Sequence, residues 1–582
     1  MCGIWAVFGS DGNVSELYHN AWKIAHRGPD SSRMENIIHF KSCCLAFHRL
    51  AIMDDVFGEQ PMRVRAYPHI WLLYNGEIYN FRLLQKQFDF QYLTECDGEA
   101  IIHLYAQGGA EYAASMLDGV FAFCLLDTAA KKVFLGRDTH GVRPMFKLCR
   151  EDSFLAICSE AKGILELEQA DNNHKEETVP FLPGYVESYD LAPSGKVTLR
   201  QFTQFHSIER KPKWSDIPLA IQPHGEDMYA NIRILFTDAV KKRLVSHRPL
   251  GCLLSGGLDS SLVAALVVKL AREADIQYPL QTYTIGVDGS SDTRAARQVA
   301  KHIGSEHHEV PFCPDEGTAI LEDVIYSLES YDVNTVRPAV CMYLISRYIR
   351  EQTDRVVIFS GEGSDELTQG YLYFHQQPSA KEGDEEGRRL LKDLYLYDVL
   401  RADRMTAAHG LELRVPFLDH HFTSYYLSLP AEARCPKLGI EKYLLRKAFD
   451  GTGLLPPKIL WRQKEGFGEG VSSRKKSWLD SLTEFANEKV NPSSVDDTEF
   501  RCAEELFPFN PPKTKEAFYY RQIFEKRFPG HARWIPYAWL PKWDEDTSAP
   551  SGRVQTIRQG TGFTKAGRKS LEEGSSPGVA KS

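Results

Sequence analysis

The sequence predicts two domains, an α+β domain of stacked β-sheets flanked by helices and, after it, an α/β domain built on a parallel sheet. A chain of 582 residues is too long for one hydrophobic core, so at least two domains are expected. Residues 1 to about 200 hold apolar β-type stretches and few long helical patterns. From residue 226 on, strand, loop and helix alternate, which is typical of a parallel sheet with helices on both faces.

We expect the first domain to span residues 2–190 and the second domain to span residues 226–540. The stretch 191–225 turns polar and contains prolines, which indicates a linker. The tail, 545–582, is rich in Gly, Ser and Thr without apolar periodicity, so we expect disorder and no catalytic residue there. The charged run "KEGDEEGRR" at 381–389 predicts an exposed loop.

Composition and charge exclude several classes of protein. The formal charge of −9 argues against a general nucleic-acid binder, which usually carries a basic domain. The longest apolar run, "LVAALVV", ends at Lys269 and is far shorter than the roughly 20 residues of a membrane span. The twelve cysteines show no metal-type spacing, and the N-terminus lacks a secretory signal. We therefore expect a cytosolic protein with reduced thiols and without membrane or nucleic-acid partners.

A cysteine stands directly after the initiator methionine. Its position is compatible with chance, and it is also compatible with a catalytic role. If Met1 is removed, Cys2 carries both a thiol and a free α-amino group. Such an amine has an ordinary pKa of roughly 7.7–8.0, so a useful fraction of it is a neutral base near pH 7. One residue could then supply both a nucleophile and the base that activates it.

Two glycine-containing loops follow predicted strands of the second domain. The loop "SGGLDSS", Ser255–Ser261, precedes a helix whose N-terminus suits an anion such as pyrophosphate. It is not a Walker A loop, because no lysine follows and the glycine spacing differs. Asp259 at its end could hold a Mg²⁺ ion that bridges phosphates. The second loop, "SGEGSDE", is also acidic, and parallel strands bring both loops to the same edge of the sheet.

These motifs resemble those of a known family. The loop "SGGLDSS" is similar to the signature of the N-type ATP pyrophosphatases, which split ATP between its α and β phosphates. With the N-terminal motifs, the chain from residue 1 to about 540 resembles the glutamine-dependent asparagine synthetases. The N-terminal motifs that carry this resemblance are "MCGI", "HRGPD", "HRLAIMD", "NGEIYN", "ECDGE" and "GRDTHGVRP".

For the first domain the resemblance implies a glutaminase of the N-terminal-nucleophile fold. Cys2 would attack the side-chain amide of glutamine, and Asn75 with the backbone N–H of Gly76 would stabilise the oxyanion. "YNG" is also compatible with a hairpin turn. Arg49 would hold the glutamine carboxylate, and Asp97, supported by Glu77, would hold its α-ammonium. The implied glutamine-binding set is Arg49, Leu50, Ala51, Ile52, Met53, Asn75, Gly76, Glu77 and Asp97.

For the second domain the resemblance implies adenylation of aspartate by ATP, with release of pyrophosphate and displacement of AMP by ammonia. Glu362 would lie beside the acyl-adenylate, and Lys464 would neutralise charge on the phosphates. Arg337 would bind aspartate. Mg²⁺ would be held by Asp259 and Asp365. The implied ATP-binding set is Leu253, Ser255, Gly256, Gly257, Asp259, Ser260, Ile285, Ser360 and Gly361, although Leu253 and Ile285 would be core residues in any parallel sheet.

The sequence departs from the family pattern at three positions. Asn334 stands where the family has a threonine, Pro338 follows Arg337, and Gly466 replaces the alanine of "KEAF". These changes concern the aspartate pocket. Two alternatives stay open: a synthetase that acts on another carboxylate, and an inactive regulatory homologue. The implied small-molecule partners are glutamine, aspartate and ATP, and a homodimer is one option that the sequence leaves open.

Overall fold

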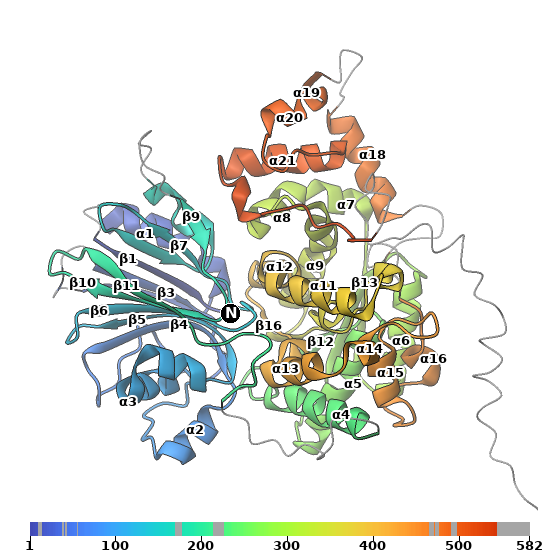
Figure 1. Cartoon of the computed structure of the whole chain (residues 1–582), viewed down its shortest axis with the longest axis horizontal. Coiled ribbons are helices and arrows are strands. Elements are labelled where there is room, and N and C mark those ends of the chain that lie inside the picture. Colours follow the sequence, from blue (N-terminus) through green and yellow to red (C-terminus); the bar gives the residue numbers. More distant parts are fainter. Residues whose placement is uncertain are drawn as a thin grey trace, which may run out of the picture.

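The computed structural model describes residues 1–9, 14–37, 40, 43–54, 56–168, 177–213, 226–464, 471, 477–490 and 498–543. Figure 1 shows two bodies beside one another, with stacked β-sheets in the N-terminal part and a helix-covered sheet in the C-terminal part. The predicted architecture of an α+β domain followed by an α/β domain is confirmed.

The N-terminal domain consists of two antiparallel sheets. Its strands are β1 (Gly3–Phe8), β2 (Ser31–Asn36), β3 (Cys43–Arg49), β4 (Ile70–Ile78), β5 (Gly119–Asp127), β6 (Lys132–Arg137), β7 (Phe146–Cys149), β8 (Leu155–Cys158), β9 (Thr178–Pro180), β10 (Tyr185–Leu191) and β11 (Val197–Gln204). One sheet has the order β2-β3-β1-β8-β7-β9 and the other the order β11-β10-β6-β5-β4.

Strand β1 is buried on both faces, which explains its unbroken apolar sequence. Because side chains alternate along a strand, Ile4, Ala6 and Phe8 point into the apolar layer between the two sheets. On the opposite face of the strand, Trp5 and Val7 belong to a second, larger apolar cluster that also includes Leu17 and Ala21.

The helices of this domain are α1 (Val14–Trp22), η1 (Ala25–Arg27), α2 (Phe81–Phe88), α3 (Glu99–Met116), η2 (Ala161–Gly163) and η3 (Leu165–Leu167).

The second domain is built on a parallel sheet. Its strands are β12 (Leu250–Leu253), β13 (Gln281–Gly286), β14 (Glu306–Pro311), β15 (Val357–Phe359) and β16 (Glu412–Arg414). They lie in the order β14-β13-β12-β15-β16, and every neighbouring pair is parallel. The carboxyl ends of the strands therefore meet at one edge, where ligands bind in sheets of this kind.

Helices surround this sheet, and a C-terminal group of helices packs beyond it (Figure 1). The helices around the sheet are α4 (Glu226–Lys242), α5 (Leu258–Glu273), α6 (Ser291–Ile303), α7 (Pro314–Ala319), α8 (Leu321–Leu328), α9 (Val333–Gln352), α10 (Ser364–Leu367), η4 (Leu372–Gln376), α11 (Ala380–Asp393), η5 (Leu394–Leu396), α12 (Asp398–Ala407), η6 (Pro416–Leu418), α13 (His420–Ser428), α14 (Ala431–Arg434), α15 (Tyr443–Phe449) and α16 (Pro457–Leu460). The C-terminal group consists of α18 (Trp478–Val490), α19 (Thr498–Arg501), α20 (Ala503–Leu506), α21 (Lys515–Arg527) and η7 (Ala532–Trp534).

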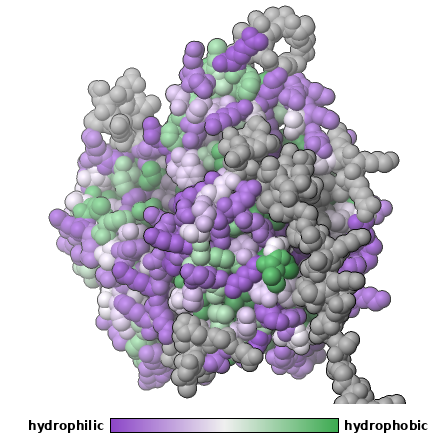
Figure 2. Space-filling model, turned by 45° about the vertical axis from the view of Figure 1, so that its right-hand side comes forward, coloured by the Kyte–Doolittle hydropathy of each residue, from purple (hydrophilic) through white to green (hydrophobic). Residues whose placement is uncertain are grey.

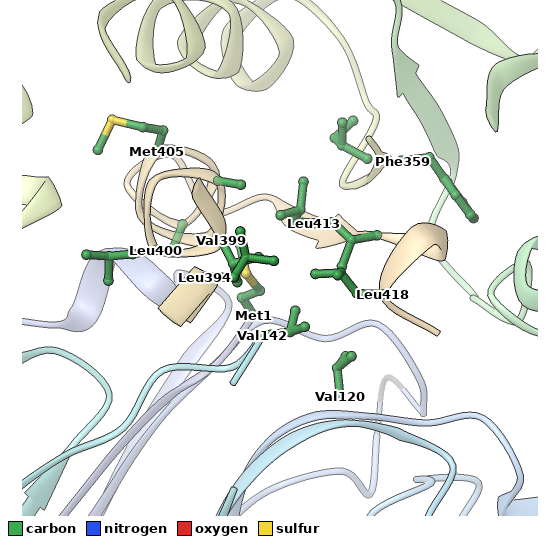
Figure 3. Close-up of a cluster of buried hydrophobic side chains, with 14 of the residues drawn as sticks. Met1, Val120, Val142, Phe359, Leu394, Val399, Leu400, Met405, Leu413 and Leu418 are labelled. Carbon is green, nitrogen blue, oxygen red and sulfur yellow. The ribbon is translucent and has the colours of Figure 1, made fainter. Parts of the chain in front are cut away.

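An apolar layer joins the two domains. Figure 3 shows Met1, Val120 and Val142 of the first domain facing Leu413 and Leu418 of the second. All five side chains are buried. The N-terminus of the chain therefore lies at the domain interface, beside the edge strand β16.

Buried ion pairs also cross this interface. The Arg27 guanidinium donates to Glu160 at 2.7 Å and to Asp403 of the second domain at 2.8 Å. Arg404 of α12 donates to Glu329 at 2.8 Å and to the carbonyl of Ser159 at 3.1 Å. Loss of one partner of such a buried pair costs about 3–5 kcal/mol, so these contacts fix how the domains meet.

Two regions differ from the sequence-based expectation. The run 381–389 is not an exposed loop: it lies in α11, whose Gly383 and Gly387 are buried. Strand β11 falls inside the range 191–225 that we expected to be a linker, and it pairs with β10 from Val197 to Gln204, with one shift of register next to Ser188. Residues 214–225 and the tail 545–582 lie outside the described residues.

The surface is mainly polar on the face that Figure 2 presents, where hydrophilic side chains dominate and apolar ones form small groups. Among the described helices, none combines the length and the apolar character that a membrane crossing requires.

Candidate active sites

The first site surrounds the predicted nucleophile. Cys2 directly precedes β1 and is partly buried. Its Sγ lies 3.5 Å from the backbone nitrogen of Leu50 and 3.6 Å from the Leu50 carbonyl oxygen. Its own backbone N–H donates to Asn75 Oδ1 at 2.8 Å. Burial raises the pKa of the Cys2 thiol, so the thiol needs a base before it can act as a nucleophile.

The ammonium group of Met1 is buried at the same place. It lies 3.4 Å from Glu412 Oε2 on strand β16 of the second domain. Burial lowers the pKa of this amine, although the Glu412 carboxylate opposes the shift. An amine at this position therefore loses its proton more readily than an exposed one.

The predicted oxyanion donors lie in strand β4. Asn75 and Gly76 form part of the β4–β5 ladder, so the alternative hairpin turn at this Asn-Gly pair is wrong. The Asn75 side chain is completely buried, and its Nδ2 has no hydrogen-bond partner among the described residues. Gly76 has no room for a side chain, because a Cβ there would lie 2.1 Å from the Val120 carbonyl oxygen. A buried donor without a partner beside the nucleophile suits an oxyanion.

Arg49 ends strand β3, next to Leu50, whose backbone contacts the thiol. Its guanidinium bonds to the carbonyl of Asp54 and lies 3.4 Å from Glu59 Oε1. The Ser31 hydroxyl donates to the same Glu59 oxygen at 2.6 Å. The remaining predicted residues of this loop, Leu50, Ala51, Ile52 and Met53, are all buried.

The two predicted acidic residues have different surroundings. Asp97 is buried and accepts hydrogen bonds from the Tyr74 hydroxyl and, at 2.5 Å, from the Ile78 N–H. Burial raises the pKa of Asp97 to about 6. Glu77 points toward Arg414 of the second domain at 3.4 Å, and burial raises its pKa well above the usual range. Glu77 therefore belongs to the domain interface as well as to this site.

The second site is a cavity of about 350 Å³ at the carboxyl ends of β12, β13 and β15. Of the predicted residues, Gly256 alone is missing from the described lining; its φ of +75° and a Cβ position 2.4 Å from the Ala296 nitrogen require glycine. The predicted residues that line the cavity are Leu253, Ser255, Gly257, Asp259, Ser260, Ile285, Arg337, Ser360, Gly361, Glu362, Asp365 and Lys464.

The two glycine loops touch one another. A Cβ on Gly361 would lie 2.8 Å from the Ser260 nitrogen and 2.9 Å from Asp259 Cβ. Within the first loop the hydroxyls of Ser255 and Ser260 are 3.0 Å apart. Ser260 lies in the first turn of α5, where backbone N–H groups and the helix dipole favour an anion.

Two lysines join the acidic residues of these loops. Lys442 Nζ lies 2.6 Å from Asp259 Oδ2 and 2.6 Å from Asp365 Oδ1, and Lys464 Nζ lies 2.5 Å from Asp365 Oδ2. Although burial opposes the shift, both lysines hold the pKa of Asp365 below its usual range. Interaction with Asp365 raises the pKa of Lys464 against the effect of burial, so Lys464 stays charged. Lys442 was missed by the sequence analysis.

Two arginines line the part of the cavity around Arg337, the residue that the resemblance assigns to aspartate. We call this part the acceptor end. Arg337, predicted to bind aspartate, forms a bidentate pair with Glu516 of α21, with distances of 2.8 and 2.7 Å. Arg401 of α12, which the sequence analysis missed, donates to Glu362 Oε2 at 2.9 Å and also pairs with Asp398. Burial raises the pKa of Glu362 even though Arg401 is close. Gly466 lies outside the described residues.

Comparisons with known proteins agree with this arrangement. Residues 1–204 match the family model of the glutamine amidotransferase domain, and residues 231–386 and 378–550 match the model of asparagine synthase. The fold and the two sites thus define a glutamine amidotransferase domain joined to a synthase domain in one ligase chain.

Curated relatives narrow this class to one family. The chain is 58% identical over 558 residues to the glutamine-hydrolysing asparagine synthetase of Gallus gallus, covering 95% of this chain and 98% of the relative. It is 57% identical over 560 residues to that of Cricetulus griseus, covering 96% and 99%, and 56% identical over 566 residues to that of Homo sapiens, with the same coverage. The chain belongs to the family of glutamine-hydrolysing asparagine synthetases.

Proposed function

We propose that this chain makes asparagine from aspartate and ATP, with the amide nitrogen of glutamine. Glutamine and water give glutamate and ammonia at the first site. Aspartate and ATP give β-aspartyl-AMP and pyrophosphate at the second site, and ammonia then displaces AMP to form asparagine. The observation that carries the proposal is that one chain holds both sites. In the first, Cys2 lies beside Asn75, whose buried Nδ2 has no hydrogen-bond partner in the part of the chain that the structure describes, and in the second, two glycine loops of the phosphate-binding type line one cavity.

In the first reaction Cys2 is the nucleophile. We propose that removal of Met1 frees the Cys2 amine, which takes the thiol proton as the thiolate attacks the amide carbon. The oxyanion is stabilised by Asn75 Nδ2 and the Gly76 N–H. Collapse of the tetrahedral intermediate passes the proton to the leaving ammonia and gives a thioester, which water hydrolyses to glutamate. Arg49 holds the substrate carboxylate and Asp97 its α-ammonium.

In the second reaction the reacting carboxylate is a poor electrophile until it is adenylated. The β-carboxylate of aspartate attacks the α-phosphorus of ATP, and pyrophosphate leaves toward the first glycine loop. Lys464 and Lys442 offset the charge on the departing pyrophosphate. Arg401 and Arg337 bind the two carboxylates of the acceptor in a partly desolvated site. Each arginine then shares its charge with the carboxylate that it already contacts, Glu362 or Glu516.

Mg²⁺ suits the donors of this cavity. Asp259 and Asp365 come from the two facing loops, and carboxylate oxygens together with substrate phosphates are the ligands that Mg²⁺ prefers. Lys442 contacts one oxygen of each carboxylate, Lys464 contacts the other oxygen of Asp365, and the Ser364 hydroxyl donates to the other oxygen of Asp259. An ion held by Asp259 and Asp365 would therefore take the place of some of these contacts. When bound, the ion would supply positive charge to the phosphate oxygens of ATP.

The bond that breaks in ATP tests this proposal. With ATP, Mg²⁺, aspartate and an ammonium salt, we expect AMP and pyrophosphate in equal amounts, because the loops suit detached pyrophosphate. Separation of the nucleotides by ion-exchange chromatography, with a coupled pyrophosphate assay, measures both products. ADP and orthophosphate as primary products would overturn the adenylation mechanism.

The raised pKa of Asp97 predicts a pH dependence of glutamine binding. A carboxyl whose pKa is about 6 is a carboxylate above that pH and is neutral below it. We therefore expect the Kd of glutamine to rise about tenfold for each pH unit below about 6. Calorimetric titration of the Cys2→Ala variant between pH 5 and 8 measures binding without hydrolysis of the glutamine. A Kd that stays constant over this range would remove Asp97 from the ammonium site.

We also propose a cytosolic location, because all twelve cysteines are free thiols, as a reducing compartment favours. A homodimer stays a prediction, which light scattering on the purified protein measures.

A further inference from the structure

Residues 535–543, which we call the C-terminal strap, follow η7 and run as an irregular segment (the dark red coil below α21 in Figure 1). Trp539 of this strap lines the cavity of the second site and is only 9% exposed. The cavity thus has one wall that comes from outside the parallel-sheet core. The sequence analysis assigned no role to this segment.

Both backbone polar groups of Trp539 are fixed by the N-terminal end of α9. Its N–H donates to Asp332 Oδ1 at 2.9 Å, and its carbonyl accepts a hydrogen bond from Asn334 Nδ2 at 2.7 Å. Asp332 is itself fixed, because it caps α9 by accepting from the Thr335 N–H at 2.9 Å. Helix α9 also carries Arg337, so strap and arginine share one rigid element.

The indole of Trp539 packs on the side chains at the acceptor end. Its ring centroid lies 5.2 Å from that of Tyr371, whose hydroxyl donates to Asp398 Oδ2 at 2.8 Å. Asp398 pairs with Arg401, and Arg401 donates to Glu362 at 2.9 Å. The strap therefore reaches the residues beside the reacting carboxylate through one continuous set of contacts.

The residues that the proposed function assigns to ATP form another part of the cavity, which we call the nucleotide end. It is formed by the strand ends at Leu253 and Ile285 and by the first glycine loop, which lie on β12, β13 and α5. Trp539 contacts neither of the two glycine loops through any hydrogen bond among the described residues. An effect of Trp539 on acceptor binding can thus be separated from an effect on ATP.

We propose that Trp539 is a specificity-determining wall of the acceptor pocket, which limits the length of the amino dicarboxylic acid that fits. Asn334, where the resemblance puts threonine in the family, is a positioning residue that acts through the Trp539 carbonyl. This inference rests on the proposed function of the second site. Because the N–H and the carbonyl of Trp539 are both hydrogen-bonded, its ring has a fixed position. A fixed ring excludes an acceptor that is one methylene longer than aspartate more strictly than a mobile side chain does.

The test uses the full-length protein with ammonia as nitrogen donor and pyrophosphate release as readout. For Trp539→Ala we expect the KM of aspartate to rise at least tenfold, with the KM of ATP changed less than twofold. The preference in kcat/KM for aspartate over glutamate should fall at least tenfold. Trp539→Phe should retain most of the preference. Deletion of residues 544–582 leaves the strap in place and should change neither quantity.

Asn334 is tested by the same assay. Asn334→Leu removes the donor at similar volume and should raise the KM of aspartate with little change in kcat, while Asn334→Thr restores a donor and should recover most of the affinity. Glutamine hydrolysis at the first site reports whether each variant is folded.

An unchanged aspartate KM and unchanged preference in Trp539→Ala would overturn the inference, and so would an equal rise in the KM of ATP. If the wild type prefers an acceptor other than aspartate, the proposed function fails. The same variants measured on that acceptor still test the wall.

Discussion

Replacement of Cys2 by alanine is expected to lower glutamine hydrolysis by about 10³-fold or more, because the residual rate of such enzymes without their nucleophile is small. In the proposed mechanism the Cys2 thiol forms the thioester. Ammonia-dependent asparagine synthesis should persist near the wild-type rate, because Cys2 is not among the residues that line the second cavity. Glutamate release and pyrophosphate release are measured in parallel, with glutamine or an ammonium salt as the nitrogen source.

Cys149→Ala is the matched control, since Cys149 is an exposed thiol at the end of β7. It should leave both activities unchanged. Glutamine hydrolysis by Cys2→Ala at the wild-type rate would show that another group attacks the amide, and the N-terminal-nucleophile mechanism would be wrong.

Replacement of Lys464 by alanine should have the next largest effect, on the opposite activity. Lys464 lines the cavity and stays charged beside Asp365. Removal of one group that stabilises charge in a transition state typically costs about 10²–10³ in rate. We expect aspartate-dependent pyrophosphate release to fall by about that factor, with glutamine hydrolysis unchanged. Lys442 remains in this variant and keeps the two acidic loops together.

Lys458→Ala is the control for charge alone, because Lys458 is an exposed lysine on α16. It should change neither activity. Pyrophosphate release by Lys464→Ala within twofold of the wild type would remove Lys464 from the phosphate site.

The meeting of the two glycine loops in the second cavity could be predicted from the sequence, because each loop is a contiguous motif that follows a strand. Ser255 to Ser260 and Ser360 to Asp365 follow strands of one parallel sheet, so their meeting at one edge follows from topology alone. The Asn75–Gly76 pair lies in β4, where Asn75 contacts Cys2, and the alternative interpretation of the pair as a turn was wrong. Strand pairing with β5 decides its conformation, and that pairing is a contact distant in sequence.

Some contacts of the second site could not be predicted, because the residues that make them are far apart in the sequence. Lys442 meets Asp259 from 183 positions away, and Arg337 meets Glu516 from 179 positions away. Nothing local in the sequence marks either pair. Trp539 reaches the cavity only because the strap is fixed on α9.

The misread run 381–389 has a physical explanation as well. Gly383 and many charges favoured a loop, but the helix buries Gly383 and Gly387 against the rest of the domain. Lys381 and Glu385 are exposed, whereas Glu386 is buried with Leu390 and Leu391 and pairs with Arg389 at 2.7 Å. Tertiary packing therefore overrides the low helix propensity of glycine.

The transfer of nitrogen from glutamine to aspartate within one reaction mixture tests the whole account most directly. Glutamine labelled with ¹⁵N in its amide is incubated with the protein, aspartate, ATP and Mg²⁺, and the products are measured by NMR. We predict asparagine that carries ¹⁵N in its side-chain amide, formed in equal amount with AMP and pyrophosphate. Glutamate and labelled ammonium without labelled asparagine would contradict the account, because the two sites would then not act in one reaction.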